Sequence, residues 1–449
     1  MIMNKKWIII GISIILVIVL LGSGYFYYEL NRLDKRNYNP KVEINPQKNY
    51  TIEIWDLKKP HMYISEEQQI QVWKKIVDEF KGQYPNIHLD IKLLSYDEYL
   101  QSIEKGIKNK NMADIVIDWL GTPFIDLEMQ IPVNKYLDLQ QRFLSGTIDY
   151  VAYNQKHLAY PLIAIPNMLI GNLELLEEFE DIIQIAIEGW SLEEFVDFIK
   201  KVDNLGKYPV NVFDYRGNFT RNLLVQGDIT SITVNNKLNW YGHTLITWFN
   251  ELEKLKKEEL IVYNRSWLAD FWKGKVAILA GAPHWVVTET IKRNEALDQN
   301  KIKGAGSTQR IQTIFLPYPY IVDHSQQYGM KQVSAVPFSQ RTYKGEDHSK
   351  GVIEALQTIG PIYSLELAKV HGFIPADKTL IKEWSDNNGL SPYCNKVIHL
   401  SAEKGKPVIS RDFKDLKREL EALEKTQKIL DDYWLGKITL QKFLEEIQN

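Results

Sequence analysis

Segments with strand and helix patterns alternate over residues 50–117, and this order constrains the fold more than any other feature of the chain. Residues 50–55 (YTIEIW), 87–93 (IHLDIKL) and 114–117 (DIVI) are short and either alternating or apolar, as expected of strands. Between them, 65–84 and 97–107 carry apolar residues at helical spacing. A strand–helix–strand–helix–strand order predicts a parallel sheet in an α/β layer.

The same alternation continues through the rest of the chain. A length of 449 residues exceeds the size at which one hydrophobic core stops growing, so we expect two domains. The many Lys and Glu residues near the C-terminus are expected to lie on solvated helix faces. The expected helices are 191–202, 241–260, 350–367 and helices within 412–448, and the expected strands are 210–213, 275–280 and 314–317.

The charge balance argues against a protein that binds nucleic acid, because 54 basic and 57 acidic side chains leave a net charge of only -3. Hydrophobic residues make up 45% of the chain, which is enough to bury proper cores. Aromatic residues reach 12%, with 12 Trp and 24 Tyr. This aromatic content is typical both of dense cores and of carbohydrate-binding sites, and composition leaves the two open.

Motifs for catalysis and for metal or cofactor binding are missing from the sequence. Cys394 is the single cysteine, so neither an internal disulfide nor a multi-cysteine metal site can form. The nine histidines show no H-E-x-x-H spacing, and no G-x-S-x-G occurs. The GAGST stretch at 304–308 lacks the lysine of a phosphate loop, and the Glu pairs at 193–194 and 445–446 lie on expected exposed helices. We therefore expect no catalytic residue, no metal and no cofactor.

The apolar run Trp7–Tyr28, about twenty residues long, is sufficient to cross a bilayer as a helix. Gly24 stands where an exported lipoprotein would carry the cysteine of its L-x-x-C box, so no lipid can attach there. The run exceeds the usual length of about 7 to 15 residues for the apolar core of a cleaved signal peptide, and Tyr25, Tyr27 and Tyr28 resemble an interfacial aromatic belt. These features favour a retained transmembrane helix, with cleavage after Gly24 as the alternative.

Nine blocks of sequence occur in the order seen in a known family. They are YTIEIWDL, FKGQYPNIHLDIKLLSYDEYLQSIEKGI, ADIVIDWLGTPFIDLEMQIPVNKYLDL, HLAYPLIAIPNMLIGN, GWSLEEFVDF, FWKGKVAILAGAPHWV, TIFLPYP, KVHGFIPA and YWLGKITLQKFLEEI. Each block alone is a weak signal, but chance would not preserve both their content and their order. From residue 50 to 447 the chain resembles the extracellular solute-binding proteins of ABC importers, in particular the maltodextrin-binding kind.

This resemblance implies an α/β fold of the periplasmic-binding-protein-like type II, with two lobes joined by hinge crossovers and preceded by one N-terminal transmembrane helix. The implied hinges are Tyr160–Pro161 and the stretch around 317–319, where proline limits the backbone angles. The expected division is 1–28 for the anchor or uncleaved signal, 29–47 for the tether, 48–159 plus 267–318 for the first lobe, and 160–266 plus 319–449 for the second lobe.

The resemblance also places candidate ligand-binding residues at the ends of strands. Sugars need aromatic plates for their C–H faces and polar groups for their hydroxyls. Trp119 follows the DIVI strand, at the carboxyl end where open α/β sheets bind ligands. Trp55 and Asp56 end the first strand and are expected to face the same cleft. Packing between the lobes is the competing interpretation for Trp119.

Three further candidates come from later segments. Trp285 follows the strand KVAILA and occupies the family's second aromatic position. Tyr215 and Arg216 could present an aromatic ring and a planar donor from the second lobe, although a surface turn explains them equally well. The family's Y-Y-N element is replaced here by Leu169, Ile170 and Gly171, so the resemblance does not support a ligand contact from this element.

The resulting prediction is an extracytoplasmic substrate-binding component of an ABC importer. It would bind a carbohydrate, with an oligosaccharide as the leading class, in the interlobe cleft by hinge closure and would perform no catalysis. The expected partners are the ligand, the permease subunits and the membrane through the N-terminal helix, for a monomer whose main domain is extracellular. The alternative is a membrane-anchored ligand sensor or a wall-polymer-binding accessory protein without a transport role. A cleft enzyme is the third possibility.

Overall fold

The structure is a computed structural model of the chain. It describes residues 39–61, 64–177, 179, 184, 188–204, 206–214, 218–226, 233–234, 237–238, 243–263, 267–302, 309–320, 326–339, 344–408 and 410–447. The predicted anchor 1–28 and the first part of the predicted tether lie outside these residues. Within the ranges given, no helix is both long and apolar enough to cross a membrane.

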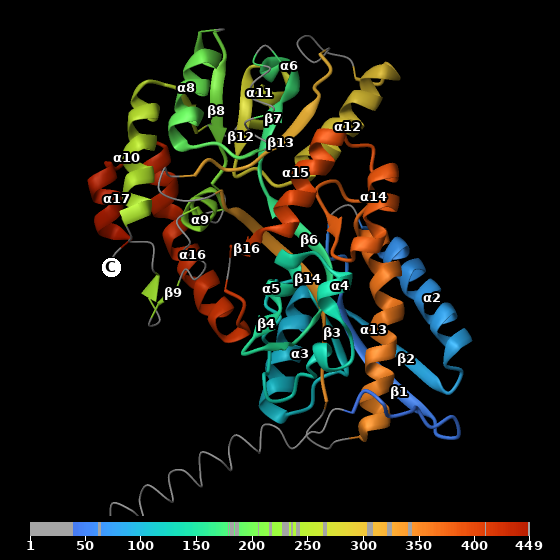
Figure 1. The fold of residues 1–449 in the computed structure, drawn as a ribbon. Helices are drawn as coiled ribbons and strands as arrows, with labels where there is room; N and C mark the ends of the chain where they lie inside the picture. The colour runs from blue at the N-terminus through green and yellow to red at the C-terminus, as the bar shows by residue number, and fades with distance from the viewer. Residues whose placement is uncertain are drawn as a thin grey trace, which may run out of the picture.

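The first lobe is built on a seven-stranded sheet in the lower half of Figure 1. The strand order is β15-β6-β14-β3-β1-β2, and β16 pairs with β14. As predicted, β1 is parallel to both β2 and β3, whereas β14 runs antiparallel to β3 and β6. The bounds are β1 Tyr50–Leu57, β2 Ile87–Leu94, β3 Ile115–Asp118, β6 Tyr160–Asn167, β14 Tyr328–Pro337, β15 Ile374–Pro375 and β16 Gly405–Pro407.

Helices with strong N-terminal caps cover this sheet. Ser65 and Ser95 each accept a hydrogen bond from the third helical backbone N–H, and the residue at that position bonds back to the serine N–H. These capping boxes explain where the two predicted helices begin. The helices and short elements of the lobe are α2 Glu66–Gln83, α3 Tyr96–Asn109, α4 Leu139–Arg142, α5 Ser145–Tyr150, α13 Glu346–Leu367 and the hairpin β4 Ala152–Tyr153 and β5 Lys156–His157.

The second lobe is built on a five-stranded sheet with the order β11-β8-β12-β7-β13, in the upper half of Figure 1. Strand β12 is parallel to β8 and antiparallel to β7, which also pairs with β13. The strands are β7 Leu169–Asn172, β8 Tyr208–Val212, β11 Ile261–Val262, β12 Val276–Ala280 and β13 Thr313–Leu316. The helices around it include α6 Leu173–Leu176, α8 Leu192–Asp203, α9 Asn218–Val225, α10 His243–Lys257, α11 Trp267–Trp272 and α12 Trp285–Asp298.

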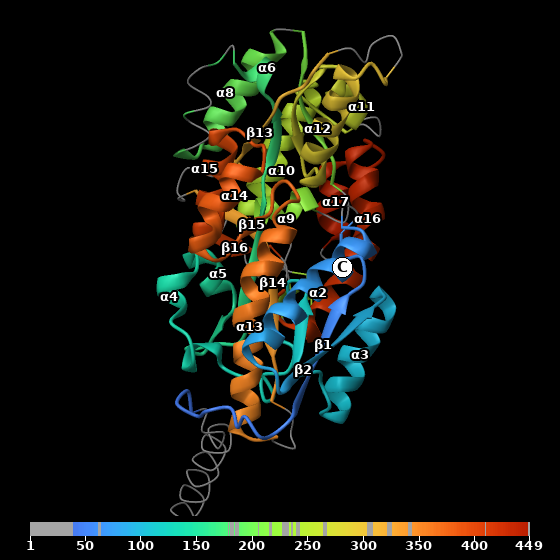
Figure 2. The same ribbon diagram turned by 90° about the vertical axis from the view of Figure 1, so that its right-hand side faces the viewer.

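The C-terminal helices complete the molecule. They are α14 Ile381–Asn387, α15 Pro392–Glu403, α16 Phe413–Trp434 and α17 Leu440–Glu446. Helix α16 starts beside the first lobe, where Phe413 bonds to Phe124, and ends in the second lobe, where the Trp434 ring packs on Phe219. Figures 1 and 2 show the two sheets following one another along the long axis of the molecule, with α13 beside the first and α12 beside the second.

The strand pairing differs from the predicted division of the chain between the lobes. Residues 267–318 were expected in the first lobe, but β12 and β13 pair with β7 in the second sheet. Conversely, β6 and β14, which were expected in the second lobe, form the centre of the first sheet. The reason is that these strands form antiparallel pairs with strands distant in sequence: β12 and β13 with β7, and β6 with β14. The apolar pattern of a strand does not specify which strand it pairs with.

The crossover between the lobes also differs from the expected position. Tyr160 and Pro161 do not form a joint, because they pair with Ala335 and Ser334 inside the first sheet. The chain instead passes from β6 to β7 at Met168, between Asn167 of the first sheet and Leu169 of the second. A second crossing connects β13 to β14.

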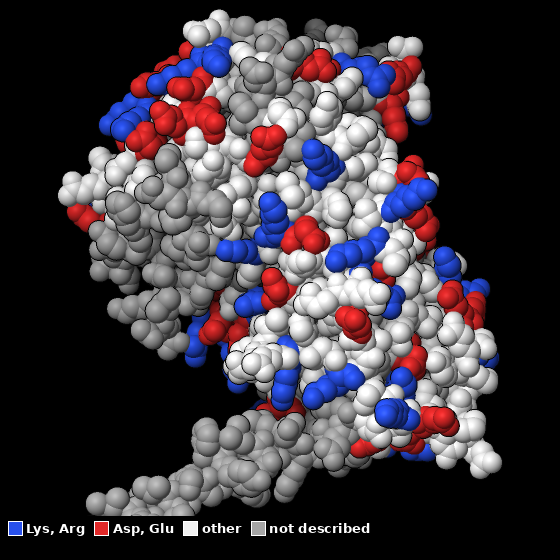
Figure 3. All heavy atoms as spheres, viewed as in Figure 1, with Lys and Arg blue, Asp and Glu red and all other residues white. Residues whose placement is uncertain are grey.

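Charged side chains of both signs are interspersed over the described part of the face in Figure 3. This mixture agrees with the near-zero net charge and gives that face no strong field of one sign.

Packing is dominated by apolar and aromatic groups inside both lobes. The fully buried Trp190, for example, packs edge-on against Phe195 and donates to the Pro317 carbonyl over 2.8 Å.

Candidate functional site

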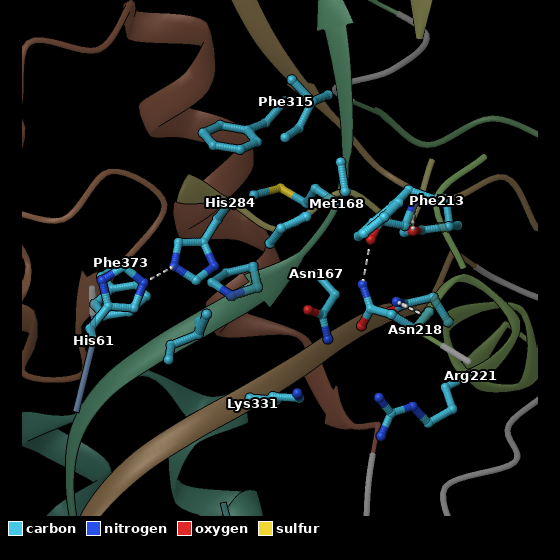
Figure 4. Close-up of a pocket in the computed structure, with 18 of the residues that line it drawn as sticks. His61, Asn167, Met168, Phe213, Asn218, Arg221, His284, Phe315, Lys331 and Phe373 are labelled. Carbon is cyan, nitrogen blue, oxygen red and sulfur yellow. Dashed lines mark hydrogen bonds between the residues drawn. The ribbon is translucent and has the colours of Figure 1, made fainter. Parts of the chain in front are cut away.

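A cavity of about 340 Å³ lies between the two sheets (Figure 4). Its size falls at the small end of the range of about 300–1,000 Å³ that is typical of ligand pockets. Both lobes contribute to its wall. The lining residues are Pro60, His61, Trp119, Ile165, Pro166, Asn167, Met168, Ile170, Phe213, Asn218, Arg221, Asn222, Gly281, Ala282, Pro283, His284, Phe315, Tyr318, Lys331 and Phe373.

The carboxyl ends of four strands converge on this cavity. In the first lobe, β1 leads to Pro60 and β3 leads directly to Trp119. In the second lobe, β8 leads to Phe213 and β12 leads to Gly281. Ligands of open α/β sheets bind beyond the carboxyl ends of parallel strands, so the topology of both lobes points to the same site.

Gly281 allows the ends of β8 and β12 to meet at the cavity wall. Its φ of 76° is in the left-handed region, and a Cβ at this position would lie 2.3 Å from the Phe213 carbonyl oxygen. The Gly281 N–H donates to the Tyr318 hydroxyl over 2.9 Å, and its carbonyl accepts from the Asn218 amide over 2.8 Å. This glycine therefore positions an asparagine and a tyrosine of the wall.

Trp119 is a half-buried aromatic wall of the cavity, and its orientation is set by Asp56. The indole nitrogen of Trp119 donates to Asp56 Oδ1 over 3.0 Å. The other oxygen, Oδ2, accepts from Gln69, Trp73 and Tyr363, each over 2.8 Å. Burial raises the pKa of Asp56, and these four donors act in the opposite direction by stabilising the carboxylate. The geometry gives Asp56 a role in holding Trp119 rather than a direct place on the wall.

The other predicted ligand residues do not line the cavity. The Trp55 indole nitrogen donates to Glu53 over 2.8 Å, and its ring packs against the core of the first lobe. Trp285 is the first residue of α12 and packs against the core of the second lobe, although its neighbour His284 does line the cavity. Tyr215 and Arg216 lie outside the described residues. Among the predicted residues that the structure describes, Trp119 alone forms part of the wall.

Sequence reasoning missed the polar side chains of the cavity. Asn218, Arg221 and Asn222 project from α9 at the spacing i, i+3 and i+4, which places them on one helical face. Lys331 interrupts the otherwise uncharged strand β14. Both features are visible in the sequence as polar residues within short apolar segments. They could have been selected only with knowledge of which face the cavity occupies.

Two amide groups at the cavity have unused hydrogen-bonding capacity. Asn222 is 1% exposed, and its amide nitrogen donates to the Asn218 carbonyl over 2.7 Å. Asn222 Oδ1 and Asn167 Nδ2 are buried and have no hydrogen-bond partner among the described residues. Buried polar atoms without partners are costly, so a polar ligand or water in the cavity would satisfy them.

A pair of histidines joins the lobes at the cavity. His61 Nε2 lies 3.2 Å from His284 Nε2, and the two rings are stacked (Figure 4). Phe373 packs against both rings. Burial lowers the pKa of His61 to about 4 and that of His284 to about 3, so both imidazoles are neutral at neutral pH and one donates to the other.

The sequence of this chain matches one protein family over more than half of its length. Residues 65–319 match the family model of the bacterial extracellular solute-binding proteins. The chain belongs to this family. The family predicted from the sequence is therefore confirmed, and the two-lobe α/β fold of this solute-binding protein agrees with it.

Several solved structures share the fold of this chain at low sequence identity. UspC of M. tuberculosis has a TM-score of 0.65 at 13% identity, with 89% of this chain and 98% of UspC covered. The sugar-binding protein MalE of Xanthomonas citri has a TM-score of 0.64 at 13% identity, covering 88% and 95%. The maltose/maltodextrin-binding domain MalE of Bdellovibrio bacteriovorus, bound to maltotriose, has a TM-score of 0.52 at 17% identity, covering 89% and 97%. No curated protein sequence matches this chain significantly.

Proposed function

We propose that this solute-binding protein is the extracytoplasmic substrate-binding component of an ABC importer and that it binds a carbohydrate, specifically an oligosaccharide. The observation that supports this best is the cavity of about 340 Å³ whose wall is formed by both lobes. A ligand that touches both lobes can favour the closed arrangement over an open one. Binding and release of this kind need no bond-making chemistry.

The groups on the wall are suited to a sugar. Trp119 and Phe213 are half-buried aromatic rings that can cover C–H faces, and Asn167 and Asn222 have amide atoms that can bond hydroxyls. The maltotriose bound by the domain from Bdellovibrio bacteriovorus shows that a protein of the same fold holds an oligosaccharide. We extend this ligand class to the present chain as part of the proposal.

The proposed motion is a rotation about the crossings between the lobes. The β6 to β7 crossing changes sheet within one residue, Met168, and both Asn167 and Met168 line the cavity. A small change in backbone angles at this point would move one sheet relative to the other. Because the same residues touch the ligand space, binding and closure would be coupled directly.

We further propose that the segment 7–28 anchors the protein in the cell membrane with Lys5 and Lys6 inside and the lobes outside. The protein would act as a monomer and deliver its ligand to permease subunits. Affinity capture of the full chain from membranes separates this role from that of a sensor. Permease subunits in the eluate support import, whereas a membrane kinase without a permease would support sensing.

The central experiment measures ligand binding by the full chain in detergent. Isothermal titration and tryptophan fluorescence are recorded with a panel of oligosaccharides, and with peptides of similar mass as controls. We expect a saccharide to bind and to change the fluorescence, because Trp119 lines the cavity. Binding of peptides without any response to saccharides would contradict the carbohydrate proposal and leave the family assignment intact.

A further inference from the structure

The fixed charges on the cavity wall have one sign. Arg221 and Lys331 line the cavity, whereas no Asp or Glu is found among its lining residues in the described part of the chain. His61 and His284, the remaining basic residues of the wall, are neutral at neutral pH because burial lowers their pKa values to about 4 and about 3. The wall therefore presents positive charge to a ligand.

Two carboxylates close to the wall are engaged elsewhere. Asp56 accepts four hydrogen bonds from side chains of the first lobe, as described above. Asp214, at the end of β8, accepts from the Phe219 and Thr220 backbone N–H groups, the Thr220 hydroxyl and the Trp434 indole. Both are buried behind the wall, so neither offers an oxygen to a ligand.

A third carboxylate, Glu419 of α16, lies behind Arg221. Glu419 Oε1 is 3.8 Å from an Arg221 guanidinium nitrogen, and Oε2 accepts from the Ser410 N–H over 2.8 Å. Burial raises the pKa of Glu419, while Arg221 and Lys331 act to lower it. Among the residues that the structure describes, Glu419 thus faces both cations, and its one negative charge does not balance their two positive charges.

The two cations come from different lobes. Arg221 belongs to α9 of the second lobe, and Lys331 belongs to β14 of the first sheet. In Figure 4 both side chains point toward the region below Asn167. Repulsion between these like charges would oppose any approach of the lobes that shortens the distance between them, whereas an anion between them would convert the repulsion into attraction from both sides.

We propose that the saccharide bound in this cavity carries an anionic group, a carboxylate, sulfate or phosphate, which is held between Arg221 and Lys331. This inference rests on the proposed function, because it specifies the ligand of the same site. The planar guanidinium of Arg221 can bond two oxygens of such a group, and Lys331 adds a point charge from the opposite lobe. The amides of Asn167 and Asn222 would bond neighbouring hydroxyls.

The test compares sugars that differ in charge but not in length. Titration calorimetry of the full chain in detergent uses trigalacturonate as the carboxylated probe and maltotriose as the neutral probe. A sulfated disaccharide, compared with the same disaccharide without sulfate, and glucose 6-phosphate, compared with glucose, distinguish the other anionic groups. We expect at least one anionic probe to bind about tenfold or more tightly than its neutral counterpart, and we expect that preference to shrink as salt is raised.

Variants then assign the preference to the two cations. Lys331→Gln should weaken binding of the anionic probe by about tenfold, a larger factor than any loss of affinity for the neutral probe. Lys406→Gln is the matched control, because Lys406 is a half-buried lysine on the adjacent strand β16 and does not line the cavity. Arg221→Lys retains the positive charge but loses the planar guanidinium. Of the three kinds of anionic probe, the carboxylated one should therefore lose the most affinity.

The possible results separate the two levels of the proposal. The anionic ligand would be overturned if neutral sugars bound as tightly as their anionic counterparts, or more tightly, and if Lys331→Gln left the affinity for the anionic probes unchanged. Carbohydrate binding would then remain in place. Failure of every saccharide, neutral or anionic, would overturn the proposed carbohydrate function itself. Thermal unfolding of each variant without ligand shows whether a loss of affinity reflects a loss of fold.

Discussion

The Trp119 indole donates a hydrogen bond of 3.0 Å to Asp56 Oδ1, and this bond connects the wall of the cavity to a fully buried carboxylate. Trp119 follows β3 and Asp56 lies near the end of the adjacent parallel strand β1. The pairing of these strands places the ring and the carboxylate side by side. An aromatic group of the cavity wall is thus held by the packing of the first lobe.

Replacing Asp56 tests how much this cluster stabilises the fold. Asp56→Ala removes the shared acceptor of four donors, three of them buried, so the free energy of unfolding should fall by about 3 kcal/mol. Urea unfolding followed by circular dichroism measures the change. Asp78→Ala, on the exposed face of α2, should change stability by less than about 0.5 kcal/mol. Equal effects of the two variants would contradict the structural role of Asp56.

Truncation of Trp119 tests its place in the binding site. Trp119→Ala should weaken binding of a saccharide by about tenfold or more, since a half-buried aromatic wall of the cavity is lost. Titration calorimetry measures the affinity. Trp55→Ala is the control, because Trp55 is also half-buried but does not line the cavity. A comparable loss of affinity in both variants would point to a general loss of structure.

A substitution at Gly281 tests the close approach of β8 and β12. Gly281→Ala combines an unfavourable φ of 76° with a Cβ only 2.3 Å from the Phe213 carbonyl oxygen. We expect a loss of about 2 kcal/mol or more in stability, together with weaker ligand binding. Gly82→Ala, in α2, has no atom within 4 Å of the new Cβ and should be neutral or stabilising. A Gly281→Ala variant as stable as the unsubstituted protein would contradict this prediction.

The histidine pair predicts a dependence of stability on pH. The usual histidine pKa of 6.5 is lowered by burial to about 4 for His61 and about 3 for His284. Between pH 6.5 and pH 4 the unfolded chain binds more protons at these positions than the folded chain, so stability rises with pH across this window and falls on acidification. Melting temperatures recorded from pH 7 to pH 4.5 should show this slope.

Variants can assign part of that slope to the pair. His61→Gln combined with His284→Gln should flatten it, whereas His88→Gln, at an exposed position on β2, should leave it unchanged. Some slope will remain because burial also lowers the pKa values of His157, His348 and His371. An identical slope in the double variant would show that the pair does not contribute.

The proposed membrane anchor predicts where the protein is found in cells. The full chain should sediment with membranes and resist extraction by high salt, because the segment 7–28 is long enough to span the bilayer. Removal of residues 1–28 should release the lobes in soluble form. The N-terminal residue of the mature protein decides between the alternatives: Met1 indicates a retained anchor, and Tyr25 indicates cleavage after Gly24.

Much of the secondary structure and one part of the site could be predicted from sequence. Local patterns indicated the strands around 50–57 and 87–94 and the helices that Ser65 and Ser95 cap. Trp119 was found because it directly follows a buried strand, and strand ends of α/β sheets bind ligands. These signals are local, so they can be read without knowledge of the fold.

Other features depend on contacts between distant segments. Strand β14 joins β3 and β6 across more than 150 residues of sequence, and β12 joins β7 across about 100, so the predicted lobe boundaries were wrong at these strands. Asn222 and Lys331 lie at the cavity only because α9 and β14 meet there. No periodicity in either segment specifies that meeting.

The sequence by itself determined the family, the alternation of strands and helices and the candidate aromatic residue Trp119, because each of these is recorded in local order and spacing. Tertiary structure alone decided which strands share a sheet, that Asp56 supports the wall instead of forming it, and that two cations from different lobes meet at one cavity. The physical reason is that strand partners, burial and the distance between charges are set by long-range packing, which residues adjacent in sequence do not specify.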